Sequence, residues 1–358
     1  MGRESRIDGS PARILPDERL HGWRGFLGRA PGRSVLAATL AFGLSCPMLA
    51  SAALDQTITV RLGHVMPPTH FEQTAVLKFA EDVAKRSNGK IVIKVFPANQ
   101  LGSEREQTES VNLGALEMTI GGGAIQNHVP GLGVYGLPFI FRDAAHFDKV
   151  MDGPIGEQLK AMSLKHSGIR ILDLFPNGER MFFNRKRPFT KLKEFEGVKI
   201  RVDDQPASAA IWRALGSNPI PMAYNEVYTA LQTGVVDAAE NPPAGILRMK
   251  FYEVGKYVTV TRHMLTVHAF MANEKWWQGL PAEARQIIQD AMKTYVPERR
   301  RLSWEADATT VDELKKLGAV VSPLENPGEF AAALAPVHKQ YGERYGVMEL
   351  IERIKATK

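Results

Sequence analysis

Two arginines occupy positions at which an α/β protein commonly contacts its ligand. Arg180 begins a predicted strand that ends at Asn184, and Arg201 lies at the end of another, KIRV (199–202). Ligands of α/β sheets bind in the crevice at strand ends, and a planar guanidinium group can bind a carboxylate through two hydrogen bonds. The spacing is therefore compatible with a carboxylate site. A surface ion pair is the commoner role of a single arginine, and position alone does not separate the two.

Other motifs give little support to catalysis. The sequence contains no G-x-S-x-G, H-E-x-x-H, Walker or C-x-x-C motif. GLGVYG (131–136) matches the dinucleotide fingerprint, but it lies between two prolines without the required strand and helix, so we predict an ordered loop. His64 and His70 have no carboxylate at ligand spacing. Asp203 and Asp204 are adjacent strand-end residues that face opposite ways. We therefore predict no catalytic residues, no metal site and no cofactor.

The glycines at 121–123 directly follow a predicted strand. Glycine lets the backbone approach a ligand closely, and the same residues are also common in a plain turn. The sequence leaves both interpretations open.

The charge of the chain does not indicate a nucleic-acid partner. The 358 residues include 45 Lys and Arg against 39 Asp and Glu, a net charge of +6. Half of this excess lies in the first 53 residues, which contain seven arginines and four acidic residues. Basic and aromatic residues are not interleaved along one face, as nucleic-acid binding would require. The 44% hydrophobic content is typical of a globular protein and excludes a disordered chain.

The N-terminal segment is typical of an exported protein. Arg24, Arg29 and Arg33 precede an uncharged run (34–54) that ends in small residues. This pattern predicts a signal peptide within residues 1–53, with an N-terminal membrane anchor as the alternative. Cleavage would remove Cys46, the only cysteine, and leave a soluble protein without stable membrane insertion. A chain without cysteine suits the bacterial periplasm.

Hydrophobic patterning predicts an α/β fold. The mature chain begins with strand 57–62, helix 71–86, strand 90–96, helix 103–113 and strand 116–120, an alternation that predicts a parallel sheet with helices on both faces. Residues 281–317 predict one helix of about 35 residues, roughly 50 Å long, which Pro297 interrupts without ending. A helix of this length should cross two lobes. The remaining predicted helices are 144–151, 156–166, 208–215 and 225–233, followed by two at the C-terminus, and the remaining strands are 169–174, 181–184, 199–202, 235–239, 257–261, 266–272 and 319–322.

Five segments resemble one family when they are taken together. They are NQLGSEREQ (99–107), LPFIFRD (137–143), GVKIRV (197–202), PMAYNEVYTALQTGVVDAAENP (221–242) and KFYEVGKYV (250–258). In order and spacing, over about residues 56–350, the chain resembles the DctP-type solute receptors of tripartite ATP-independent periplasmic (TRAP) transporters. The resemblance implies a two-lobed periplasmic binding protein fold, with mixed β-sheets flanked by helices and a long helix spanning both lobes. We place lobe I at 54–177 plus 267–306 and lobe II at 178–266 plus 307–358.

The resemblance also implies a ligand site. The family arginine that pairs with the ligand carboxylate corresponds to Arg201, and a second family arginine corresponds to Arg180. The other positions implied are Asn241, which donates its amide to the same carboxylate, its supporting neighbour Glu240, the aromatic wall Tyr224, and Ser103 and Gly122 from the other lobe. The chain departs from the common pattern in two places: VDAAENPP replaces VDGQENP, and RVDD replaces RVP, which puts Asp203 near the arginine.

A receptor of this family captures a small organic acid by hinge closure and delivers it to the TRAP membrane permease. The ligand would be a sugar acid such as a uronate, or a C4-dicarboxylate. Two alternatives share the site: a periplasmic lyase or isomerase, with Glu240 or Asp203 as base, and the binding component of a sensor system. The sequence does not decide the ligand or the oligomeric state.

Overall fold

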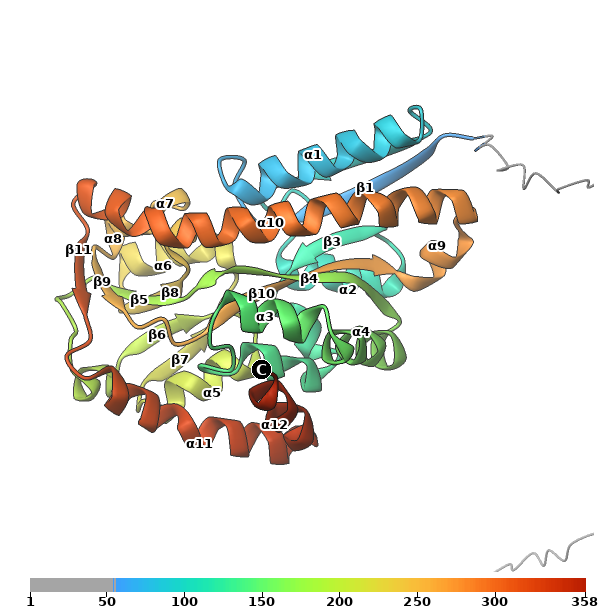
Figure 1. Ribbon diagram of the computed structural model, residues 1–358. Helices are drawn as coiled ribbons and strands as arrows, with labels where there is room; N and C mark the ends of the chain where they lie inside the picture. Colours follow the sequence, from blue (N-terminus) through green and yellow to red (C-terminus); the bar gives the residue numbers. More distant parts are fainter. Residues whose placement is uncertain (1–53, 55) are drawn as a thin grey trace, which may run out of the picture. The chain divides into compact units, whose positions relative to one another are not determined.

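Two mixed β-sheets, each flanked by helices, form the core of the protein (Figure 1). The computed structural model describes residue 54 and residues 56–358, so the predicted signal peptide lies outside the described residues. The first sheet has the strand order β2-β1-β3-β10-β4, and the second has the order β11-β9-β5-β8-β6-β7. Each sheet forms the centre of one lobe. No helix among the described residues is long and apolar enough to cross a bilayer.

The first sheet confirms the predicted β-α-β-α-β start. Strand β1 (Ile58–His64) pairs in parallel with both β2 (Ile91–Phe96) and β3 (Met118–Gly121). The connecting helices are α1 (Phe71–Arg86) and α2 (Glu104–Leu113). Helix α2 begins with the predicted capping box, in which the Ser103 hydroxyl accepts the Glu106 N–H and the Glu106 carboxylate accepts the Ser103 N–H. This cap fixes the end of α2 that faces the candidate site.

Two long strands complete the first sheet and carry the chain toward the second. Strand β4 (Ile169–Glu179) follows helices α3 (Ala144–Met151) and α4 (Pro154–Ser167). Strand β10 (Leu265–Asn273) is antiparallel to both β3 and β4. Because β4 leads into β5, and β9 leads back into β10, the chain crosses twice between the sheets at neighbouring positions.

The second sheet is built from shorter strands. Their bounds are β5 (Met181–Asn184), β6 (Lys199–Val202), β7 (Asn218–Pro221), β8 (Ala238–Asn241), β9 (Tyr257–Val260) and β11 (Val320–Pro323). Its helices are α5 (Pro206–Ala214), α6 (Val227–Thr233), α7 (Pro243–Arg248) and α8 (Phe251–Val254). Strand β6 is parallel to β7 and β8, so the ends of β6 and β8 lie at one edge of the sheet. That edge carries Arg201 and Asn241.

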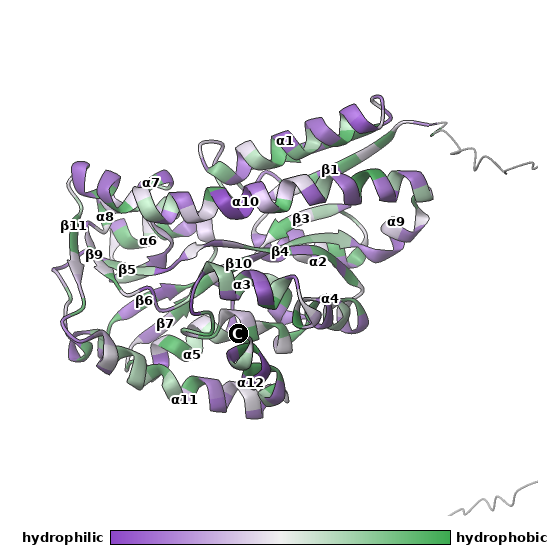
Figure 2. Cartoon of the chain, viewed as in Figure 1, coloured by the Kyte–Doolittle hydropathy of each residue, from purple (hydrophilic) through white to green (hydrophobic). Residues whose placement is uncertain are grey.

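The predicted long helix is confirmed. Helix α10 (Ala282–Lys316) follows the short α9 (Glu274–Gly279) and runs for 35 residues with Pro297 inside it. It packs on α1 and β4 in the first lobe and on α7 in the second (Figure 1). Figure 2 shows hydrophilic and hydrophobic residues mixed along α1 and α10, as expected for helices with one buried face. Helices α11 (Pro327–Tyr345) and α12 (Met348–Ala356) end the chain. The proposed lobe boundaries stay predictions.

Helices α7, α8 and α9 were not predicted from the sequence, and the following details of the prediction are wrong. The strand predicted at 235–239 begins three residues later, because Gly234 adopts a φ of 80° and the Val236 N–H still bonds the Ala230 carbonyl at the helix exit. GLGVYG was predicted as a loop but belongs to a 3₁₀ helix, Pro130–Gly136. A second 3₁₀ helix, and not a strand, directly precedes it, so the segment lacks the strand that the dinucleotide fingerprint requires. Strand β7 was not predicted at all, since two of its four residues are prolines, which sheets admit mainly at edges.

Candidate functional site

A cavity of about 230 Å³ opens between the two lobes at the strand ends. This volume is below the roughly 300–1,000 Å³ typical of sites for drug-sized ligands, so it suits a small solute. The lining residues come from the start of α2, from the segment after β3, from the end of β6 and from the segment after β7. They are Ser103, Glu104, Arg105, Gly123, Ala124, Arg201, Asp203, Asp204, Pro221, Met222, Ala223 and Tyr224.

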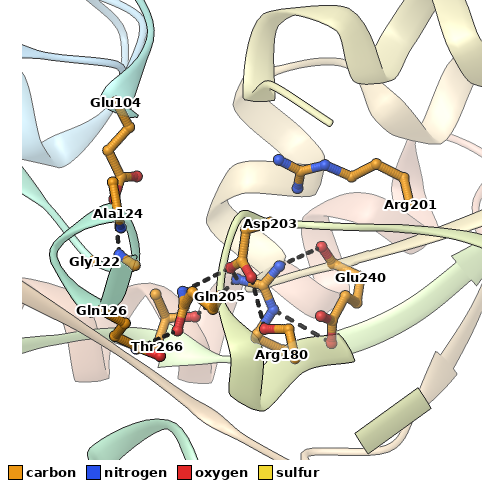
Figure 3. Close-up of polar contacts among 12 residues, drawn as sticks. Glu104, Gly122, Ala124, Gln126, Arg180, Arg201, Asp203, Gln205, Glu240 and Thr266 are labelled. Atoms are coloured by element: carbon orange, nitrogen blue, oxygen red, sulfur yellow. Dashed lines mark hydrogen bonds and ion pairs between the residues drawn. The ribbon is translucent and has the colours of Figure 1, made fainter. Parts of the chain in front are cut away.

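Arg201 presents a buried positive charge to this cavity. The residue is only 3% exposed, and its Nε and Nη2 atoms donate to the Met222 carbonyl over 3.0 and 2.7 Å. Figure 3 shows its guanidinium group extending toward the wall that bears Glu104. Among the described residues, no carboxylate forms an ion pair with it. Burial lowers the pKa of Arg201, and the nearby Asp203 only partly opposes this effect.

Arg180, by contrast, is surrounded by protein partners. It lies between β4 and β5 and is 3% exposed. Its Nη1 is 3.1 Å from Asp203 Oδ2 and its Nε is 3.4 Å from Glu240 Oε2. Nη1 also donates to the Thr266 hydroxyl and Nη2 donates to the Glu240 carbonyl (Figure 3). Burial opposes the charge of Arg180, but Glu240 and Asp203 outweigh it and raise the pKa.

Glu240 is a fully buried support for this arginine. It lies on β8 opposite Phe182, and its Oε2 atom is 2.6 Å from His263 Nε2. Burial alone would raise the pKa of Glu240, but Arg180 and His263 lower it to about 2. The side chain is therefore a fixed anion that neutralises Arg180.

Tyr224 lies beside Arg201, and Asn241 lies close to the Tyr224 hydroxyl but is not among the residues that line the cavity. The Tyr224 ring lies 5.8 Å from the Arg201 guanidinium carbon, and its buried hydroxyl has no hydrogen-bond partner among the described residues. A Cβ atom on Gly245 would come within 2.1 Å of Asn241 Oδ1 and 2.9 Å of the Tyr224 hydroxyl, so only glycine leaves room for both side chains. Burial raises the pKa of Tyr224 to about 12, so the hydroxyl stays protonated and can donate.

The first lobe contributes backbone and carboxylate groups. Glu104 Oε1 accepts the N–H groups of Gly123 and Ala124 at 2.7 and 2.9 Å. Ser103 lines the cavity, with its hydroxyl 2.8 Å from Glu106 Oε2. Gly122 is not among the lining residues; a Cβ there would lie 3.0 Å from the Val267 carbonyl. Close packing against β10 therefore explains why residue 122 is a glycine. The adjacent Gly123 is the glycine that lines the cavity.

Comparison with known proteins identifies the family. Residues 62–344 match the model of the bacterial extracellular solute-binding proteins of family 7, called DctP. The chain belongs to this family. It is 34% identical to a solute-binding protein of Verminephrobacter eiseniae over 92% of this chain and 98% of that protein. It is 33% identical, with the same coverage, to the C4-dicarboxylate-binding periplasmic protein DctP of Rhodobacter capsulatus. The predicted resemblance to TRAP receptors is confirmed.

Solved structures of the family have the same fold. The sugar acid binding protein of Advenella mimigardefordensis, in complex with galactonate, superposes with a TM-score of 0.81 at 30% identity, covering 84% of this chain and 98% of that one. A TRAP periplasmic solute-binding protein of Bradyrhizobium, in complex with galacturonate, gives 0.80 at 33% identity, covering 84% and 100%. The two-lobed fold is thereby confirmed for this receptor.

The sequence analysis missed the residues that join the lobes of the receptor. Asp204 pairs with Arg105 at 3.1 Å and accepts from the Asn127 amide at 3.1 Å. The buried Gln205 accepts from Gln126 at 2.8 Å. Asp204 and Gln205 belong to the second lobe and follow shortly after Arg201 in the sequence. Their partners belong to the first lobe, where they lie at the start of α2 or after β3. The unusual RVDDQ segment is the one sequence feature that could have indicated these contacts. The residues that Asp204 and Gln205 contact are distant in sequence and become apparent only in the folded structure. Within residues 56–358, no cluster of three His, Cys, Asp or Glu residues could hold a metal ion.

Proposed function

We propose that this receptor captures a small organic acid whose carboxylate binds Arg201. The supporting observation is that Arg201 is 3% exposed and faces the cavity, while its only hydrogen-bond partner among the described residues is a neutral carbonyl. An isolated charge taken out of water is costly unless it is paired. A ligand carboxylate supplies that missing partner.

The neighbouring groups define the rest of the proposed clamp. Tyr224 offers a buried hydroxyl beside the guanidinium group, and Asn241 offers an amide close to that hydroxyl. Arg180 and Glu240 pair with each other, and in this proposal they stabilise the wall of the site and do not contact the ligand. Hydrogen bonds to charged groups contribute about 1.5–3 kcal/mol each. Two or three of them supply a large share of the roughly 8 kcal/mol that a micromolar Kd requires.

We propose a sugar acid as the ligand. The relatives solved in complex with galactonate and galacturonate support this choice. The relative named as a C4-dicarboxylate-binding protein supports the other class. Glu104 and Asp203 line the cavity as acceptors, which favours a ligand that offers hydroxyl donors beside its carboxylate.

We propose that closure of the lobes couples capture to transport. Both lobes line the cavity, so the ligand binds the closed form better and shifts the equilibrium toward it. The closed surface would then be presented to the TRAP membrane permease in the periplasm. The predicted signal peptide supports export, and a receptor encoded beside a pair of membrane subunits would support transport over the role of a sensor component.

An enzymatic role is less well supported. Glu240, a nominal base, is held as an anion with a pKa of about 2 by Arg180 and His263. A general base works best when its pKa lies near the operating pH. Recovery of unchanged acid after incubation, measured by mass spectrometry, distinguishes a receptor from a lyase or isomerase.

The decisive variant is Arg201→Ala. A thermal-shift screen with galactonate, galacturonate and succinate would first identify an acid that stabilises the wild type. We expect the variant to bind that acid at least about 100-fold more weakly by calorimetry, because truncating one partner of a buried charge pair costs about 2–5 kcal/mol. Arg213→Ala, at an exposed arginine of α5, should bind normally. Unchanged affinity of Arg201→Ala would contradict the proposal.

A further inference from the structure

Arg180 and Arg201 lie in one site, but only one of them is available to a ligand. The Nη1 and Nη2 atoms of Arg180 contact Asp203, the Thr266 hydroxyl and the Glu240 backbone carbonyl, and its Nε, which has no hydrogen-bond partner among the described residues, lies 3.4 Å from Glu240 Oε2. Arg180 is 3% exposed and is not among the residues that line the cavity, so a ligand carboxylate in the cavity reaches it only if one of these partners moves. Glu240 is fully buried and also bound to His263, so it cannot leave. Asp203 is the partner that lines the cavity.

Asp203 is itself held firmly in place. Its Oδ1 atom accepts from the Ser208 hydroxyl at 2.6 Å, and its Oδ2 atom accepts from the Gln205 amide at 2.8 Å. Ser208 lies on α5, whose first turn follows directly after Asp203. These hydrogen bonds hold the Asp203 carboxylate beside Arg180.

The charges around the cavity disfavour a second ligand carboxylate. The positive groups are Arg105, Arg180 and Arg201, and the negative groups are Glu104, Asp203, Asp204 and Glu240. Once the protein's own pairs are formed, Arg201 is the remaining cation and Glu104 the remaining anion. A ligand with one carboxylate satisfies Arg201. A dicarboxylate would place its second charge among anions, and like charges in an interface are strongly unfavourable.

We propose that Asp203 is a specificity-determining residue that occupies Arg180 in place of a second ligand carboxylate. The receptor then selects acids that have one carboxylate and hydrogen-bond donors, and it rejects their dicarboxylate analogues. This inference rests on the proposed function, because it takes Arg201 as the carboxylate site. Specificity of this kind comes from a built-in repulsive group as much as from new attractive contacts.

The test uses pairs of acids that differ by one carboxylate. Erythronate is compared with meso-tartrate, and galactonate with galactarate; within each pair the carbon number is the same and a terminal hydroxymethyl group becomes a carboxylate. Calorimetry should show that the wild type binds the monocarboxylate of at least one pair about 100-fold or more tightly than its partner, the size of effect expected for a like charge. The variant Asp203→Asn keeps the shape and the acceptor for Ser208 but frees Arg180. We expect it to reduce that ratio at least about tenfold, mainly by binding the dicarboxylate better.

The matched control is Asp204→Asn. It removes the same charge from the same cavity, but its partners are Arg105 and Asn127, far from Arg180 along the chain. It should leave the ratio within about threefold of the wild type, as expected for an exposed pair. Equal effects of both variants would assign the selectivity to total charge and overturn the role of Asp203.

The outcomes separate this inference from the proposed function. If the wild type binds dicarboxylates as tightly as monocarboxylates through Arg201, the inference fails while the proposed function stands. If Arg201→Ala binds acids normally, the proposed function fails. If Asp203→Asn does not fold, Asp203→Ser replaces it, and the wild-type ratio is by itself a test. An unchanged ratio in a folded Asp203 variant overturns the inference.

Discussion

Arg299 and Arg201 are two buried arginines with opposite environments. Arg299, on α10, is fully buried in the first lobe, where its Nη2 contacts Glu72 Oε2 at 2.5 Å and Asn177 Oδ1 at 2.6 Å. The rings of Phe71 and Phe175 lie 4.4 and 4.9 Å from its guanidinium carbon. Arg201 is almost as buried but has no acid partner among the described residues. Arg299 is paired within the protein, whereas Arg201 is the arginine that we propose pairs with a ligand.

Asp307 extends this comparison to an acid that forms no ion pair within residues 56–358. It lies on α10, is 5% exposed and accepts the Glu179 N–H at 2.7 Å. Burial raises the pKa of Asp307 to about 7. A buried carboxylate without a cation can take up a proton and become neutral. An arginine cannot lose its proton at physiological pH, so an unpaired buried arginine needs an anion from outside.

The largest expected effect comes from removing the paired arginine. Arg299→Ala leaves Glu72 as a buried charge that lacks its strongest partner, and breaking such a pair costs about 3–5 kcal/mol. Urea unfolding should show this loss in the variant. Arg201→Ala should cost less than Arg299→Ala, because it removes two hydrogen bonds to the Met222 carbonyl but leaves no buried carboxylate without its partner.

The double variant Arg299→Ala with Glu72→Gln is the control for charge. It should recover part of the stability, since the amide does not leave a buried anion behind. Equal destabilisation by Arg201→Ala and Arg299→Ala would contradict the division into structural and ligand-binding arginines.

A smaller effect is expected from Asp307→Asn, and it should depend on pH. The folded protein holds this proton more tightly than the unfolded chain, whose Asp pKa is about 4. The stabilisation is therefore complete below about pH 4 and is lost as pH rises through about 7. Asparagine cannot ionise, so the variant should exceed the wild type at pH 8 by on the order of 2 kcal/mol, and show no such advantage at pH 4.

Thermal melts at both pH values would measure this crossover. Asp312→Asn, at an exposed carboxylate on the same helix, should show no gain at pH 8. An Asp307→Asn variant that is destabilised equally at both pH values would show that Asp307 acts only as a hydrogen-bond acceptor for Glu179.

The smallest effect is expected at the mouth of the cavity. Arg105 and Asp204 form an ion pair at 3.1 Å, but their side chains are 65% and 37% exposed. Exposed pairs contribute about 0.2–1 kcal/mol, so Arg105→Ala should weaken binding by less than about fivefold. Calorimetry at low and high salt should show that the difference disappears when the pair is screened. A loss as large as that of Arg201→Ala would show that closure depends on this pair.

Much of the fold could be predicted because its signals are local. The capping box at Ser103 and the unbroken pattern from 281 to 317 depend on neighbouring residues, and both were placed within one or two positions. Strand β7 failed because its prolines are tolerated only through pairing with β6, which is a distant contact.

The sequence named residues for the candidate site but not the contacts that they make. The family pattern named Arg180, Arg201 and Asn241, and the structure places all three near the ends of β5, β6 and β8. Which arginine is free depends on where Asp203 and Glu240 point, and side-chain pairing across strands is not encoded in spacing. The partners of Arg299 illustrate the same limit, since Glu72 is 227 residues away in sequence.

Helix α10 holds Arg299 against the first lobe, and eight residues later it places Asp307 against Gly178 and Glu179, where the chain crosses to the second (Figure 1). Successive residues of an α-helix are rotated by about 100° around its axis, so the directions in which Arg299 and Asp307 point are fixed relative to each other. A single residue inserted between them would rotate the rest of α10 by about 100°, which turns Asp307 away from the crossing and moves the buried Thr310 and Leu314 with it. The number of residues between Arg299 and Asp307 therefore fixes both the distance between the two contacts and their relative orientation around the helix axis.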